Sequence, residues 1–130
     1  MKKLLIFTVL LIFSTVNADE NEWYLYKPGE WTPSAKTLSI IKKNLKAFVE
    51  PIAISQMQPI SNWSKYIFQY FGTVQDGERM VEIHAFCSIE NPNKLTQELI
   101  MVLDGGSCYF QLLYNPSSKQ FTDLQINGEA

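Results

Sequence analysis

QELIMVLDGGSCYFQLLYNPSSKQFTDLQIN, residues 97–127, is the stretch around which the rest of the chain can be arranged. It contains three apolar runs of strand character, at residues 97–103, 108–114 and 121–126, with a turn signal after each of the first two. The second signal, NPSS at residues 115–118, reverses the chain. The first, DGGS at residues 104–107, is either a hairpin turn or a glycine kink within one long, bent strand. We therefore predict that this stretch forms the second half of an antiparallel sheet.

The first half of the sheet is expected from residues 65–74 (KYIFQYFGTV) and residues 79–88 (RMVEIHAFCS). Asp76-Gly77 between them is a strong signal for a two-residue hairpin. Residues 23–26 (WYLY) would add a short edge strand. Because alternate residues of a strand share a face, residues 79–88 divide into two sets. The predicted core face carries Val81, Ile83, Ala85 and Cys87, and the other face carries Met80, Glu82, His84 and Phe86.

One clear helix is expected between the edge strand at residues 23–26 and the strand at residues 65–74. Thr32 is expected to cap it and Pro33 to be its first residue, where a missing N–H costs nothing. The apolar residues fall on one stripe at helical spacing, and lysines occupy the opposite, solvated side. Pro51 is expected to end the helix. The predicted stripe consists of Leu38, Ile41, Leu45, Phe48 and Val49.

These elements predict an α+β fold, with one N-terminal helix packed on a curled antiparallel sheet of four to five strands. The element order over residues 33–127 is similar to that of the cystatin-like and NTF2-like rolls. The Gln-x-Val-x-Gly loop of cystatins is absent, because residues 69–72 (QYFG) have the wrong spacing and read as strand, so protease inhibition is not implied. The segments DGGSCYF and NGEA also resemble the ends of small uncharacterised exported bacterial proteins.

Residues 1–18 (MKKLLIFTVLLIFSTVNA) have the pattern of a secretory signal peptide: two lysines, an apolar core and small residues before a cleavage site. The apolar run is shorter than the roughly 20 residues of a spanning helix, so no stable membrane insertion is expected after cleavage. We predict cleavage after Ala18, a single domain over residues 19–130, and a periplasmic or secreted location. N-terminal sequencing of the exported protein should therefore begin at Asp19, and retention of Met1 in a membrane fraction would contradict this.

Charge and cysteine content agree with export. The chain has 13 acidic and 11 basic residues, and two of the basic ones lie in the predicted signal peptide, so nucleic-acid binding is not expected. Two cysteines in an oxidising compartment predict a Cys87–Cys108 disulfide. A plain up-and-down meander would place them at opposite ends of the sheet, roughly 15–20 Å apart. We give the argument from the oxidising compartment more weight than the assumption of a plain meander. A sharp bend at Gly105-Gly106 could bring the two cysteines together.

The sequence offers little for catalysis. His84 is the single histidine, and it shares a strand face with Glu82, which makes these two the candidate catalytic pair. One histidine and two cysteines on different strands match no zinc spacing, so neither metal nor cofactor is expected.

Aromatic residues are the more prominent feature of the sequence. They are expected to fill mainly the core and the second sheet face, and Tyr66, Tyr70, Phe86 and Tyr109 are the candidate binding residues.

These observations predict an exported, non-catalytic binding protein that acts through the outer sheet face or its loops. The expected partner is another protein or a small apolar ligand. One alternative is an NTF2-like enzyme with a pocket between helix and sheet, in which His84 and Glu82 would act. A second alternative is a homodimer that pairs through the aromatic sheet face.

Overall fold

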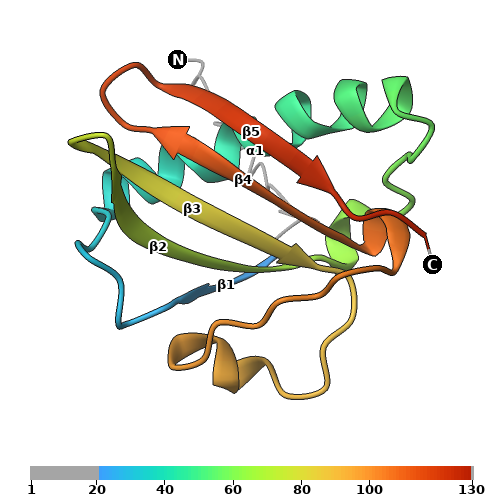
Figure 1. Ribbon diagram of the computed structural model, residues 1–130, viewed down its shortest axis with the longest axis horizontal. Coiled ribbons are helices and arrows are strands. Elements are labelled where there is room, and N and C mark those ends of the chain that lie inside the picture. Colours follow the sequence, from blue (N-terminus) through green and yellow to red (C-terminus); the bar gives the residue numbers. More distant parts are fainter. Residues whose placement is uncertain (1–20, 130) are drawn as a thin grey trace, which may run out of the picture.

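The sheet has five strands that lie side by side in sequence order, with one long helix behind them (Figure 1). The computed structural model describes residues 21–129, so the predicted signal peptide and its cleavage site lie outside the described residues. β1 pairs with β2 in parallel, and all other neighbours pair antiparallel. The predicted α+β class is thus confirmed, and so is the short edge strand, but this strand pairs in parallel, so the sheet is mixed and not wholly antiparallel as predicted. The strands are β1 (Glu22–Leu25), β2 (Ile67–Gln75), β3 (Glu78–Phe86), β4 (Tyr109–Asn115) and β5 (Gln120–Ile126).

The helix α1 spans Ala35–Ser55, and both of its predicted ends were wrong. Ser34 is the N-cap, because its hydroxyl oxygen accepts the N–H of Thr37 at 3.1 Å, and this places Pro33 before the helix. Pro51 lies inside the last turns instead of ending the helix. A proline there removes one backbone hydrogen bond, but the fully buried Ala53 keeps the following turn packed on the domain. No helix among the described residues is long and apolar enough to cross a membrane.

The core lies between α1 and the sheet, as the apolar stripe predicts. Ile41, Leu45 and Val49 are fully buried, and Leu38 and Phe48 flank them at intermediate exposure. The 3-10 turn η1 (Trp63–Lys65) leads into β2 and closes one end of this core. The core is completed by Tyr66, just before β2, and by the sheet residues Phe68, Val81, Ile83, Ala85, Phe110, Leu112 and Tyr114.

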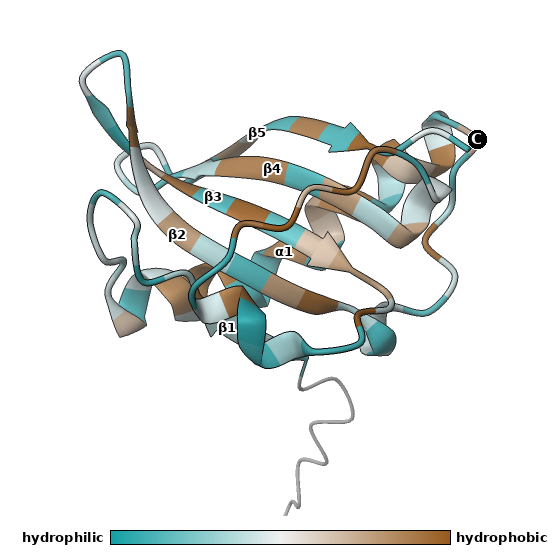
Figure 2. Ribbon diagram, turned by 60° about the horizontal axis from the view of Figure 1, so that its bottom comes forward, coloured by the Kyte–Doolittle hydropathy of each residue, from teal (hydrophilic) through white to brown (hydrophobic). Residues whose placement is uncertain are grey.

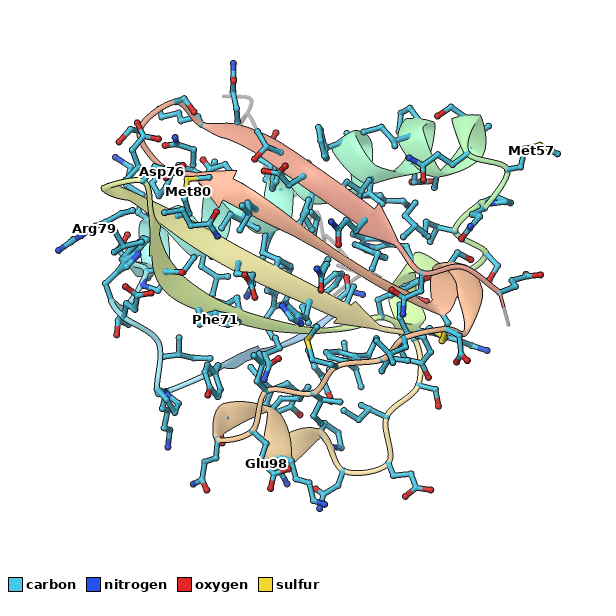
Figure 3. All side chains as sticks on the ribbon, viewed as in Figure 1. Met57, Phe71, Asp76, Arg79, Met80 and Glu98 are labelled. Atoms are coloured by element: carbon cyan, nitrogen blue, oxygen red, sulfur yellow. A yellow bond between two sulfur atoms is a disulfide. The ribbon has the colours of Figure 1, made fainter. Side chains whose placement is uncertain are left out.

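The β2–β3 hairpin turns as predicted through Asp76 and Gly77, which both have positive φ, of 51° and 79°. This is the backbone that favours Asp-Gly in two-residue hairpins. In Figure 3, Asp76, Arg79 and Met80 lie at this end of the sheet, and Met57 lies beyond the far end of α1. This end of the sheet carries the short β2–β3 and β4–β5 turns, whereas the long connection from β3 to β4 lies at the other end.

Residues 97–103 (QELIMVL), hereafter the strap, are not the strand that their apolar pattern predicts. The strap follows the 3-10 helix η2 (Pro92–Thr96) and crosses the face of the sheet that is turned away from α1 (Figure 2). It has no place in the sheet, because β3 already pairs with β4 along the edge that such a strand would need. The stretch 97–127 therefore supplies two strands and a covering segment.

The predicted Cys87–Cys108 disulfide is confirmed, with 4.8 Å between the Cα atoms. Because the strap is not a strand, the chain returns to the end of β3 where it left, and the plain meander was the wrong premise. Phe86 pairs with Tyr109, and the N–H of Cys87 donates to the carbonyl of Cys108 at 2.8 Å. Gly105 and Gly106 make the predicted bend with φ of 93° and 61°, and the 3-10 turn η3 (Gly106–Cys108) follows.

Candidate functional site

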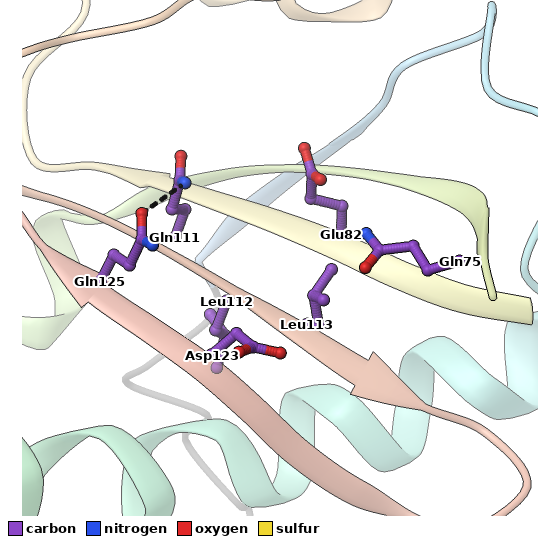
Figure 4. A pocket seen from close by; sticks show the side chains of 7 residues that line it. All are labelled: Gln75, Glu82, Gln111, Leu112, Leu113, Asp123 and Gln125. Carbon is purple, nitrogen blue, oxygen red and sulfur yellow. Dashed lines mark hydrogen bonds between the residues drawn. The ribbon is translucent and has the colours of Figure 1, made fainter. Parts of the chain in front are cut away.

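The outer face of the sheet, the face turned away from α1, contains an open groove of about 290 Å³. Figure 4 shows Gln111 and Gln125 at one end of it, joined by a side-chain hydrogen bond of 3.1 Å. Glu82 and Gln75 lie at the other end (Figure 4). Five of the seven lining residues are polar, and none is basic. The full lining consists of Gln75, Glu82, Gln111, Leu112, Leu113, Asp123 and Gln125.

Strand register explains how residues so distant in sequence meet here. Glu82 on β3 pairs with Leu113 on β4, and Gln111 pairs with Gln125 on β5. Between these rows the β4–β5 ladder shifts register, and Asp123 has φ of 55°. Aspartate tolerates this left-handed conformation better than most residues. The irregularity on β5 thus adds a second carboxylate to a groove that already contains Glu82.

His84 holds Glu82 in place. Both side chains lie on the outer face, two residues apart on β3, and the carboxylate oxygen Oε2 of Glu82 lies 2.6 Å from Nε2 of His84. His84 is only 5% exposed, whereas the carboxylate of Glu82 reaches into the groove. The sequence-predicted pair therefore exists, but it lies on the opposite side of the sheet from the space between helix and sheet.

Beneath the strap there is room for little more than a water molecule. The space between the strap and His84 measures about 20 Å³, close to the minimum that one water needs. Gln69, fully buried on β2, holds η2 and the start of the strap by donating to the carbonyls of Leu95 and Glu98, each at 2.8 Å. The side of the imidazole that faces the strap is thus closed to any substrate larger than water.

The strap turns apolar side chains outward. Leu99, Met101 and Leu103 are 44%, 59% and 88% exposed. Within the described part of the chain, no backbone-to-backbone hydrogen bond joins residues 99–104 to the sheet. Gln111 lines both the groove and the space under the strap. The polar groove and the exposed apolar side chains of the strap are therefore neighbours on one face.

The structure does not bring the four candidate aromatic residues together. Tyr66 and Tyr70 pack on the helix side of the sheet, whereas Phe86 and Tyr109 lie on the outer side under the strap. Phe86 and Tyr109 meet edge to face, with ring centroids 6.2 Å apart. The aromatic outer face expected for a ligand or a dimer is therefore largely covered by the strap.

Compared with known protein families, curated proteins and solved structures, the chain matches none of them significantly. The similarity to cystatin-like and NTF2-like rolls consequently remains one of element order. Function has to be inferred from the site itself.

Tyr66 is a structural residue. Its hydroxyl donates to the carbonyl of Ser107, next to the disulfide, which ties the start of β2 to η3. Burial raises the pKa of Tyr66 to about 12. A tyrosine whose hydroxyl is engaged inside the domain does not line an open binding surface.

Sequence reasoning missed Gln75, Gln111, Asp123 and Gln125. The available signal was the alternation of polar and apolar residues along each strand: Gln111 interrupts an apolar run in β4, and Gln125 lies between Leu124 and Ile126 in β5. This alternation alone could not place these residues beside Glu82, because their position also depends on the strand order and on the register shift at Asp123. The groove is thus a property of the assembled sheet.

Proposed function

We propose that this protein is an exported, non-catalytic binding protein whose outer sheet face holds a ligand that carries a cationic amine. The observation that supports this is the charge of the groove. Glu82 and Asp123 line it together with three carboxamides, and no lysine or arginine lines it. A primary ammonium group offers three N–H donors and a positive charge, which matches carboxylate and amide oxygens. A small apolar ligand has less support, because most of this lining is polar.

Two observations support export: the N-terminal sequence pattern and the disulfide. Disulfides form and persist in oxidising compartments and are rare in the cytosol. The Cys87–Cys108 bond therefore agrees with a periplasmic or secreted location.

The geometry of His84 supports binding over catalysis. An NTF2-like enzyme would use His84 and Glu82 in a pocket between helix and sheet, but both residues lie on the other face. His84 is closed off by the strap and is already in contact with Glu82. In the binding interpretation the histidine has a simpler role, which is to orient the carboxylate that the ligand meets.

The test is an NMR titration of the exported form with cadaverine, a flexible diamine. The side-chain amide signals of Gln75, Gln111 and Gln125 should shift in a saturable way, and pentanediol, which lacks the charge, should leave them unchanged. One charge pair at 4 Å in water contributes about 1 kcal/mol. The double variant Glu82→Gln/Asp123→Asn should therefore bind roughly 30-fold more weakly.

Glu98→Gln is the matched control, because it removes an exposed carboxylate that does not line the groove. This variant should bind like the unchanged protein. Equal shifts with the diamine and the diol, or shifts that survive loss of both Glu82 and Asp123, would contradict an amine site.

A further inference from the structure

A second cavity, of about 210 Å³, lies on the helix side of the molecule, where α1 meets β1 and η1. It shares no lining residue with the groove on the outer face. Among the described residues, no carboxylate lines it. The lining consists of Asn21, Trp23, Lys42, Lys43, Lys46 and Trp63.

The three lysines concentrate positive charge on a protein that is acidic as a whole. Lys46 has one exposed partner, Glu50 at 3.7 Å, and a pair of this kind contributes little. Glu22 neighbours Trp23 in sequence, but its carboxylate accepts the hydroxyl of Tyr24, on the opposite face of β1. The ammonium groups around the cavity are therefore weakly compensated by the part of the chain that the structure describes.

The two tryptophans give the same cavity flat, firmly held walls. Trp23 stacks on the buried Phe68 with ring centroids 4.3 Å apart, and Trp63 packs against the same ring at 5.6 Å. Asn21 donates to the carbonyls of Trp63 and Tyr66 at 2.7 Å and 3.0 Å, which ties the start of the described chain to η1. Since core contacts already fix these walls, binding a ligand would cost little free energy for ordering them.

We propose that this cavity binds a small phosphate ester with a planar ring, such as an aryl phosphate. Lysine ammonium groups bind phosphate as point charges, and several of them suit a dianion. Indole faces bind flat apolar groups. Lys42 already lies over the ring of Trp23, with Nζ 6.0 Å from its centroid, so cationic and aromatic groups are neighbours within the cavity. This site is independent of the amine groove.

Calorimetric titration of the exported form with naphthyl phosphate at low ionic strength tests the proposal. One saturable site is expected, and inorganic phosphate and naphthol should each bind at least roughly tenfold more weakly, since each lacks one half of the ligand. Lys42→Gln/Lys46→Gln should weaken binding by about 25-fold, from roughly fivefold for each charge. Both lysine side chains are exposed, so the double variant should have the same melting temperature as the unchanged protein.

Lys36→Gln is the matched control, because Lys36 is an exposed lysine of α1 outside the cavity. It should bind naphthyl phosphate unchanged, as should the groove variant Glu82→Gln/Asp123→Asn. Binding that is insensitive to Lys42 and Lys46, or equal for inorganic phosphate and naphthyl phosphate, would overturn the proposal. Tighter, lysine-dependent binding to phosphatidylglycerol vesicles would also overturn it, by assigning the cavity to lipid headgroups.

Discussion

Replacing Leu45 with alanine should lower the free energy of unfolding by about 2–5 kcal/mol, the usual range for truncating a buried leucine. Leu45 is fully buried in the middle of the α1 stripe, between Ile41 and Val49. Its side chain belongs to the cluster that joins the helix to the sheet, so the deletion leaves a cavity at their interface. Urea titration followed by circular dichroism measures the loss.

Ile54→Ala is a matched control for this experiment. It deletes the same number of carbon atoms from the same helix, but Ile54 is 65% exposed. We expect a loss below about 1 kcal/mol, because little apolar area returns to water. A loss of less than about 0.5 kcal/mol for Leu45→Ala would show that the stripe does not face the sheet.

Removing the disulfide with Cys87→Ala/Cys108→Ala should cost about 3 kcal/mol, the value expected for closing a loop of roughly 20 residues. The cysteines are 21 positions apart in sequence, and their Cα separation of 4.8 Å lies within the usual range. The backbone hydrogen bond from Cys87 to Cys108 does not depend on the sulfur atoms. We therefore expect a native spectrum with lower stability, because the effect arises mainly in the unfolded chain.

Reduction provides the control for the cysteine variant. A reducing agent should destabilise the unchanged protein by a similar amount and leave the double variant unaffected. Thiol titration of the folded, non-reduced protein should find no free thiol in the pair. Two reactive thiols in that measurement would mean that the bond does not form.

Much of the fold follows from short-range patterns. The α1 stripe, the Asp76-Gly77 hairpin and the alternation along β3 each depend on residues close in sequence, and each is confirmed. The helix ends were wrong for a local reason as well. Thr32 and Ser34 are both good caps, and Ser34 is used because its hydroxyl meets the N–H of Thr37.

The strap marks the limit of this reasoning. Residues 97–103 have the apolar pattern of a strand, but whether such a run joins a sheet depends on which edges are free. β4 occupies the edge beside β3, so the strap covers a face instead of extending a ladder. The same question of strand pairing decided the disulfide. The argument from an oxidising compartment predicted the bond correctly, whereas the assumed meander spoke against it.

The candidate sites were harder to predict than the fold. His84 and Glu82 were identified because they are two residues apart, whereas Asp123 joins Glu82 through the order of three strands and a register shift. Likewise, Trp23 and Trp63 come together with the lysines of α1 from three separate elements. Sites of this kind emerge from tertiary structure, because no local sequence spacing encodes them.

The disulfide also determines what a protease could do to this protein. The strap lies wholly between Cys87 and Cys108, and its exposed Leu99, Met101 and Leu103 are side chains that many proteases accept. Because the cysteines bracket it, hydrolysis of a peptide bond in the strap would leave two polypeptides that are still joined through sulfur. The nicked protein would migrate as one species on a non-reducing gel and separate into two only after reduction.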